Sequence, residues 1–364
     1  MTNISIILTA YNDEKNVRQC LESIIAQENT DMQMECIIVD DCSTDNTLAL
    51  IRRVAGSYKG NISFRIFRHQ SHHGVSRSRN TGFARAHGDY VMFMNATDLL
   101  RPGCMDTFMV SLMRYWDADV LVGNVFNVST RRVLFDNIAS PMALRGRGDV
   151  ICHEMLRSHL NLSACNKLVR RELLLSSHII FNESIDFADI QWANALFADV
   201  TSIALLPEIT YDLWPRPTSG IASAMKWAAA LLDSYAATCE YMLSKTPRPE
   251  GSDSDYYQLH QLFIEGVLSH ADELLAEYNV GSQMKRDLSN IRSRLLSQTR
   301  NDGQKTLYLF LKQRNSLFNT IFKLPIFRTY NALVQEVVTM LGDIAGNGTP
   351  ADQNEQQPET DYRR

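Results

Sequence analysis

The chain has 364 residues, of which 45% are hydrophobic and 21% charged, and its formal net charge is −5. This length and composition are ordinary for a globular protein with a sizeable core, arranged as one large domain or two smaller ones. The negative charge argues against nucleic acid as a partner, and the apolar runs are too short to span a bilayer. The first residues, MTNISIILTAYND, lack a basic leader and a cleavage site, so we predict no signal peptide and a cytoplasmic location.

Strands and helices are predicted to alternate along the first 120 residues. Apolar runs predict strands at 4–8, 36–39, 62–67 and 90–94. Helical spacing and start signals predict helices at 14–27, 47–54, 75–86 and 102–115. Such alternation is typical of an α/β fold, a mostly parallel sheet with helices on both faces. Ligands bind such sheets beyond the carboxyl ends of the strands, so we expect the polar segments 9–12, 40–45, 69–74 and 95–98 to converge there.

The later part of the chain changes in character. Residues 120–220 mix short apolar runs with loops, and the pattern is mostly helical from about Ala222. Residues 346–364 have almost no apolar content, which is typical of a disordered tail. We therefore expect a domain at 1–220, a helical region at 221–345 and a tail at 346–364. The helices of 222–300 are expected to pack on the first domain or on a partner chain, which would give a homo-oligomer.

Two carboxylates follow the second predicted strand in VDDCSTDNT, residues 39–47. Asp and Ser are good turn and helix-cap residues, so Asp45 has a purely structural interpretation. Asp41 has a functional one, in which its carboxylate accepts a hydrogen bond from a ligand N–H such as a nucleobase imide. Position alone leaves both interpretations of Asp41 open.

Arginines lie at the start of the third predicted helix, in HHGVSRSRNTGFARAHGDY, residues 72–90. Gly74 allows close approach of the backbone to a ligand, and a helix N-terminus favours anions. Arg suits bidentate phosphate contacts. A solvated face is the alternative for both arginines; we favour a functional role for Arg79 and leave Arg77 open. The pair His72-His73 is expected to face solvent, and we predict no zinc site there.

Three segments in order carry a resemblance to a known family: TAYNDEKNVRQCLESIIAQ, CIIVDDCSTDNT and GVSRSRNTGFARAHGDYVMFMNATDLLRP. Together they resemble the inverting nucleotide-sugar glycosyltransferases of family 2, which have the GT-A fold. Later segments extend the resemblance to about residue 220. SACNKLVRREL resembles the acceptor-side segment of that family, FNESIDFADIQW the stretch with its catalytic base, and YDLWPRPTS its Tyr-x-Tyr-Arg-x-Arg-x-x-Ser segment.

The resemblance implies a role for each matching residue. Asp189 would be the catalytic base that takes the proton of the attacking hydroxyl, as inversion at the sugar requires. Asn166 and Lys167 would lie on the acceptor side. The nucleotide sugar would be bound by Thr9, Ala10, Tyr11, Asp41, Arg79, Asn95, Ala96, Thr97 and Arg216.

The metal-binding motif of that family is altered here. Asn95 and Thr97 stand where its Asp-x-Asp motif has carboxylates, and only Asp98 keeps a negative charge. Mg²⁺ and Mn²⁺ prefer carboxylate oxygens, so metal binding is expected to be weakened. Either Asp98 holds the metal with help from the donor diphosphate, or basic side chains replace its charge, or catalysis has been lost. The candidate basic residues are Arg77, Arg79, His72, His73, Lys167 and Arg216.

Residues 304–334 form a predicted basic amphipathic helix, with five Lys or Arg residues and no Asp or Glu. Such a helix lies either on an anionic membrane surface or in a protein interface with its basic face in water. The first alternative would place the chain peripherally on the inner face of the membrane.

We therefore expect a GT-A glycosyltransferase with a helical C-terminal extension. It would move a hexose-type sugar from a nucleotide donor, expected to be UDP-linked, to a glycan or lipid-linked glycan in surface polysaccharide synthesis. The alternative is a catalytically impaired nucleotide-sugar-binding or regulatory module. A nucleotidyltransferase is disfavoured, because TAYNDEKN has no glycine-rich loop after the first strand.

Overall fold

The structure, a computed structural model, describes residues 2–28, 32–133, 140–145 and 163–214, with five isolated positions at 237, 238, 241, 286 and 290. Arg216, the segment 304–334 and the tail 346–364 lie outside the described residues, as does nearly all of 221–345. None of the helices described is both long and apolar enough to cross a membrane.

The first third of the chain alternates strands and helices, as predicted. The strands are β1 (Asn3–Ala10), β2 (Gln33–Asp40), β3 (Ser63–Arg68) and β4 (Tyr90–Asn95). The helices are α1 (Val17–Ile25), α2 (Thr47–Ser57), α3 (Val75–Phe83) and α4 (Cys104–Arg114). Helix α4 begins after Pro102 because Gly103 has a φ of 76°, outside the right-handed helical region.

The remaining described elements complete the sheet and add two helices. They are β5 (Leu99–Leu100), β6 (Val120–Asn127), β7 (Arg132–Val133), β8 (Met142–Arg145), β9 (Lys167–Arg170), α6 (Arg171–Ser176), α7 (Asp189–Asp199) and β10 (Ser202–Leu213).

All described strands join one mixed sheet in the order β3-β2-β1-β4-β9-β6-β10-β5, with β7 beside β6 and β8 beside β10. Strands β1 to β4 pair in parallel, and so do β6 and β10. Between these two parallel parts lies β9, which runs antiparallel to both of its neighbours. The predicted mostly parallel α/β sheet is therefore confirmed, with one short reversed strand at its centre.

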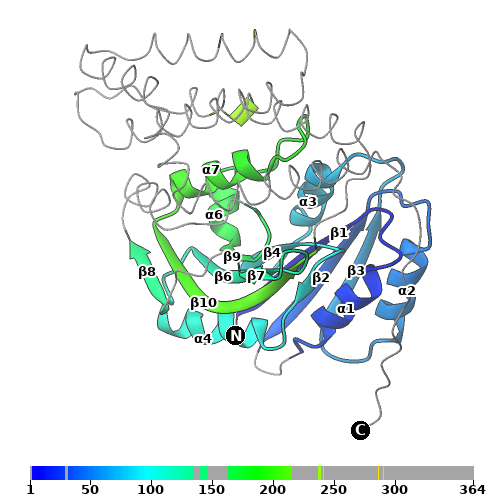
Figure 1. Cartoon of the computed structure of the whole chain (residues 1–364), viewed down its shortest axis with the longest axis horizontal. Coiled ribbons are helices and arrows are strands. Elements are labelled where there is room, and N and C mark those ends of the chain that lie inside the picture. Colours follow the sequence, from blue (N-terminus) through cyan, green and yellow to red (C-terminus); the bar gives the residue numbers. More distant parts are fainter. Residues whose placement is uncertain are drawn as a thin grey trace, which may run out of the picture.

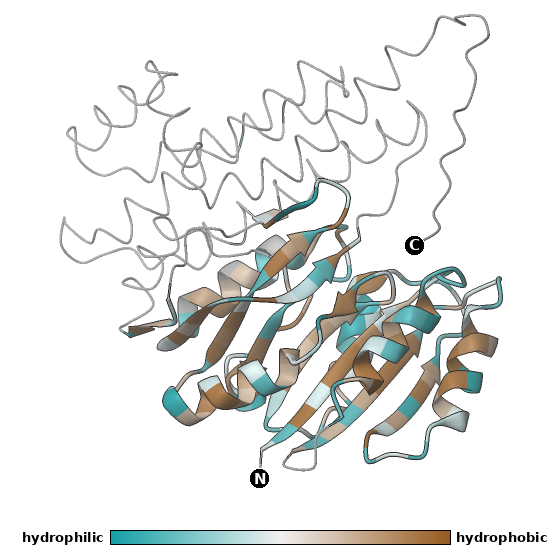
Figure 2. Ribbon diagram, turned by 60° about the horizontal axis from the view of Figure 1, so that its bottom comes forward, coloured by the Kyte–Doolittle hydropathy of each residue, from teal (hydrophilic) through white to brown (hydrophobic). Residues whose placement is uncertain are grey.

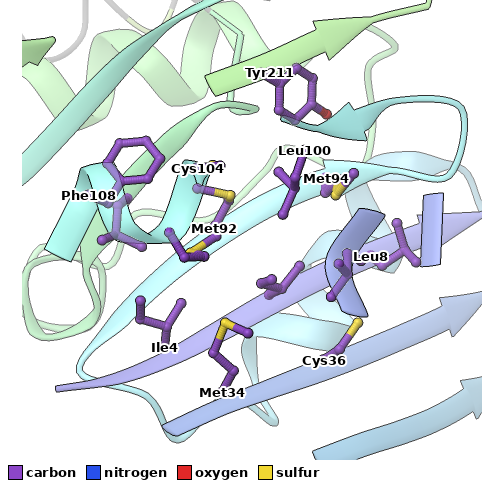
Figure 3. Packing of buried hydrophobic residues seen from close by; sticks show 14 of the residues in the cluster. Ile4, Leu8, Met34, Cys36, Met92, Met94, Leu100, Cys104, Phe108 and Tyr211 are labelled. Carbon is purple, nitrogen blue, oxygen red and sulfur yellow. The ribbon is translucent and has the colours of Figure 1, made fainter. Parts of the chain in front are cut away.

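One face of the sheet packs on α1, α2 and α4 (Figure 1). Alternate residues of each strand point to this face, which fixes the registers by burial. Figure 3 shows Ile4 and Leu8 of β1, Met34 and Cys36 of β2, and Met92 and Met94 of β4 lying together in this core. Figure 2 shows that hydrophobic residues are concentrated in the strands, whereas the helices mix hydrophobic and hydrophilic residues.

The opposite face of the sheet is covered by α3 and α7. Gly82 lets α3 lie directly on β1, since a Cβ there would be 2.4 Å from Ile7 Cγ2. Phe93 of β4 meets Phe181 and Trp192 edge-on, with ring centroids 5.0 and 5.6 Å apart. This apolar layer supports the polar side chains that lie at the carboxyl ends of the same strands.

Candidate functional site

The carboxyl ends of β2, β1 and β4 lie side by side, which brings the predicted polar segments together. Thr9 pairs with Val39 on one side and Asn95 on the other, and Ala10 pairs with Asp40. The chain beyond each strand is tied to its neighbour, because Asp41 N–H donates to the Ala10 carbonyl at 2.9 Å and Ala96 N–H to the Thr9 carbonyl at 3.0 Å. The expected convergence on one edge is therefore observed.

Asp41 is buried at this edge and is surrounded by hydrogen-bond donors. Its Oδ1 lies 2.6 Å from His69 Nδ1 and accepts from His73 N–H at 3.0 Å. Its Oδ2 accepts from Gly74 N–H at 2.7 Å and lies 2.8 Å from His72 Nδ1. Burial works to raise the pKa of Asp41, but these hydrogen bonds and the charge of His72 outweigh it and lower that pKa. Asp41 is thus a fixed carboxylate acceptor.

Tyr11 lies beside this carboxylate with its ring stacked on His72. The ring centroids are 3.8 Å apart and the planes differ by 21°. His72 was expected to face solvent, and its side chain is indeed 51% exposed, yet it also contacts both Tyr11 and Asp41. Sequence reasoning missed this pairing, because no signal in the sequence separates a ring-stacked histidine from a solvated one.

Arg79 and Asp189 form an ion pair between α3 and the start of α7. Arg79 Nη1 donates to Asp189 Oδ2 at 2.7 Å, and its side chain is only 4% exposed while that of Asp189 is 23% exposed. Arg79 Cζ lies 4.9 Å from the centre of the Phe181 ring, which supports the guanidinium from one side. Burial works against the charged form of Arg79, but Asp189 raises its pKa, so Arg79 is a permanent cation.

Asp189 is held from its other side by a single peptide group. Ala164 N–H donates to Asp189 Oδ1 at 2.7 Å, and the Ser163 carbonyl of the same peptide accepts from Lys167 Nζ. Burial would raise the pKa of Asp189, but the charge of Arg79, the Ala164 N–H and the charge of Lys167 lower it. Asp189 is therefore an ionised carboxylate at neutral pH, which is the form a general base requires.

Asn166 and Lys167, the residues predicted for the acceptor side, are fully buried. Asn166 Nδ2 donates to the Gly123 carbonyl at 2.7 Å, and its Oδ1 accepts from Thr210 Oγ1 at 2.6 Å, so this side chain ties β6 to β10. Lys167 is inside the sheet, and burial lowers its pKa to about 7. Both residues support the site from beneath and do not line it.

Asn95 connects the ion pair to Asp98. Arg79 Nη2 donates to Asn95 Oδ1 at 3.2 Å, and Asn95 Nδ2 donates to Asp98 Oδ2 at 3.0 Å. A continuous buried hydrogen-bond network thus runs from Lys167 through the 163–164 peptide, Asp189, Arg79 and Asn95 to Asp98.

Asp98 turns inward, with no exposed surface. Its carboxylate accepts from Tyr211 Oη at 2.8 Å and from Trp214 N–H at 3.0 Å, in addition to Asn95. Burial raises the pKa of Asp98 to about 6, although these hydrogen bonds act in the opposite direction. Tyr211 was not predicted as a site residue, but it begins the YDLWPRPTS segment that carried part of the resemblance.

The residues at 95–98 do not fit a Mg²⁺ or Mn²⁺ centre. Such ions need several oxygen ligands, preferably carboxylates. Here Asp98 directs both oxygens at protein donors, the Asn95 oxygen accepts from Arg79, and Thr97 offers a hydroxyl. Among the described residues, no group of three or more His, Cys, Asp or Glu side chains is placed to hold a metal ion. The expectation that Asp98 holds a metal is not supported by this geometry.

Comparison with known proteins identifies relatives of this arrangement. Residues 5–175 match the family model described as "Glycosyl transferase family 2". The poly(ribitol-phosphate) beta-N-acetylglucosaminyltransferase TarS of Staphylococcus aureus is 24% identical over 292 residues, which cover 76% of this chain and 44% of TarS. The uncharacterized glycosyltransferase YibD of Escherichia coli is 30% identical over 213 residues, 56% of this chain and 60% of YibD. The chain thus spans less than two thirds of the length of either relative.

Solved structures share the fold. The crystal structure of S. aureus TarS 1–349 superposes with a TM-score of 0.64 at 17% identity, covering 95% of this chain and 92% of that one. The same fragment in complex with UDP-GlcNAc gives a TM-score of 0.63 at 18% identity, with 82% of each chain covered. These matches confirm the expected GT-A fold.

Proposed function

We propose that this chain, whose residues 5–175 match the model of glycosyl transferase family 2, is an inverting glycosyltransferase that moves a sugar from a UDP-linked donor to a hydroxyl of a glycan or lipid-linked glycan. The observation that carries the proposal is the placement of Asp189. This ionised carboxylate lies at the carboxyl edge of the sheet, partly exposed, and is oriented on both oxygens by Arg79 and Ala164 N–H.

The proposed reaction is one in-line displacement. An acceptor hydroxyl attacks the anomeric carbon of the donor sugar, its proton passes to Asp189, and the bond from that carbon to the diphosphate oxygen breaks. The hydroxyl oxygen becomes the glycosidic oxygen, and UDP departs with the bonding electron pair. The orientation of Asp189 matters because a base acts only from hydrogen-bonding distance of the proton it removes.

The nucleotide would bind at the ends of β1 and β2, where Tyr11 offers a ring face and Asp41 a carboxylate. The departing diphosphate gains negative charge, which requires positive potential nearby. We propose that the N-terminal end of α3 and the exposed Arg77 supply it, with Arg79 beneath as a fixed buried charge. Arg216 stays a predicted donor contact.

The choice of substrates draws on the relatives. TarS has been crystallised with UDP-GlcNAc, and its name describes transfer of N-acetylglucosamine to poly(ribitol phosphate). A second relative is a teichoic acid poly(glycerol phosphate) polymerase of Staphylococcus epidermidis, 29% identical over 196 residues that cover 54% of this chain and 26% of that protein. We therefore propose a cell-surface polymer or its lipid-linked precursor as acceptor and UDP-N-acetylglucosamine as the first donor to test.

The test is turnover of UDP-sugars by the purified chain, measured as UDP release with and without added acceptor polymer. Asp189→Asn should lower turnover by about 10²- to 10⁴-fold, the usual contribution of a general base, while UDP binding persists. Asp186→Asn is the matched control, because Asp186 is an exposed carboxylate on the same segment. Equal turnover in the wild type and Asp189→Asn refutes the assignment of the base.

The alternative function is a nucleotide-sugar-binding module without catalysis. It is favoured by the tight engagement of Asp189 and by the missing carboxylates at positions 95 and 97. UDP binding by the wild type with no turnover of any donor, with or without Mn²⁺, establishes this alternative.

Contact of residues 304–334 with a membrane, a peripheral location and a homo-oligomer stay predictions. Flotation with anionic liposomes that is unchanged by deletion of 304–345 contradicts the membrane contact.

A further inference from the structure

His72 makes two contacts that a nucleobase would be expected to make at this edge. Its flat ring stacks on Tyr11 with centroids 3.8 Å apart, and its Nδ1 lies 2.8 Å from Asp41 Oδ2. A uracil ring bound between the same residues would use the same face of Tyr11 and direct an imide N–H at the same carboxylate. The imidazole thus reproduces both contacts.

Asp41 has one acceptor position left, and His72 lies over it. A carboxylate offers about four lone-pair positions, and three donors already occupy three of them: His69 Nδ1, His73 N–H and Gly74 N–H. His72 Nδ1 lies 2.8 Å from Asp41 Oδ2 and takes the space that a further donor would need. A nucleobase N–H must therefore displace one of these four groups.

His72 is the group that can leave. Two of the other donors are backbone N–H groups. The third, His69, is only 12% exposed and is held a second time by Thr81 Oγ1, 3.0 Å from its Nε2. The His72 side chain is 51% exposed and needs only a change of rotamer to reach water.

We propose that His72 is a built-in competitor for the nucleobase, which closes the base subsite in the empty protein and swings out when a nucleotide binds. The inference rests on the proposed function, since it assumes that Tyr11 and Asp41 form the base subsite. The apparent affinity for nucleotides is then the affinity of the open subsite multiplied by the fraction of molecules in which His72 has already left. The stacking contact with Tyr11 and the ion-pair contact with Asp41 hold that fraction well below one half.

The experiment compares UDP binding to the full chain and to His72→Ala by calorimetry. His72→Ala should bind UDP about three- to tenfold more tightly than the wild type. Inorganic diphosphate, which has no base, should bind both proteins equally. His87→Ala is the matched control, because it removes an exposed imidazole before β4, at the opposite end of the sheet, and should leave the UDP affinity unchanged.

The outcomes separate the two proposals. Tighter UDP binding in His72→Ala with unchanged diphosphate binding supports the competitor. Equal or weaker UDP binding in His72→Ala overturns the competitor and leaves the proposed function standing. If neither protein binds UDP or another nucleotide, both the competitor and the proposed function are refuted.

Discussion

The inward position of Asp98 predicts an unusual dependence of stability on pH. A carboxyl group has an ordinary pKa of 3.8, and burial raises that of Asp98 to about 6. The folded protein therefore holds this proton more tightly than the unfolded chain, so the free energy of unfolding contributed by Asp98 falls as the pH rises through this window. At 1.36 kcal/mol for each pH unit between the two values, the loss amounts to about 3 kcal/mol. No discount for solvent screening applies, because Asp98 has no exposed surface.

The perturbation is Asp98→Asn, which keeps the shape of the side chain and removes the titration. The assay is urea unfolding of both proteins, followed by circular dichroism at intervals from pH 3.5 to 7.5. Other carboxyls with lowered pKa values, such as Asp41 and Asp45, are common to both proteins and cancel in the difference. The stability of the wild type relative to Asp98→Asn should decline by about 3 kcal/mol as the pH rises. A flat or rising difference refutes the reasoning, since it means that the folded pKa is not raised.

Three further predictions concern the rest of the network. Arg79→Met should move the acidic limb of the kcat/KM profile to higher pH, because Asp189 loses the charge that lowers its pKa; an unmoved limb contradicts the ion pair. Lys167→Met should move the acidic limb of the same profile to higher pH by a smaller amount, because the charge of Lys167 lowers the pKa of Asp189 less than Arg79 does. Lys167→Arg keeps the charge and should leave the limb at its wild-type position. Asn95→Asp combined with Thr97→Asp should create or strengthen Mn²⁺ binding in calorimetry, at least about tenfold over the wild type; unchanged binding shows that carboxylates at these positions do not suffice.

The first half of the fold was predictable because its signals are local. Apolar runs of strand length alternate with helical spacing up to Tyr115, and burial on both faces follows from that alternation. The reversed strand β9 was not foreseen. It has four residues and begins with a lysine, so neither its length nor its hydrophobicity predicts a central strand. Its place depends on pairing with β4 and β6, which lie far away in the sequence.

The candidate site shows the same division between local and distant causes. Asp41, Asn95 and Thr9 reach one edge because each ends a parallel strand, which the sequence pattern predicts. The hydrogen bonds of Asp98 with Tyr211 and Trp214 could not be predicted, because these partners lie 113 and 116 residues further along the chain. A motif locates such a carboxylate along the chain, whereas its partners across the sheet decide which way it points.

The network from Lys167 to Asp98 is electrically neutral as it stands. With all four groups ionised, Arg79 and Lys167 carry two positive charges and Asp189 and Asp98 two negative ones. This neutral state holds between the pKa of Asp98, about 6, and the pKa of Lys167, about 7. Carboxylates at positions 95 and 97 would leave a surplus of two negative charges, which is the charge of one divalent ion. The amide and hydroxyl found there keep this interior electroneutral without any imported ion, so both substitutions are understood as one change in charge balance.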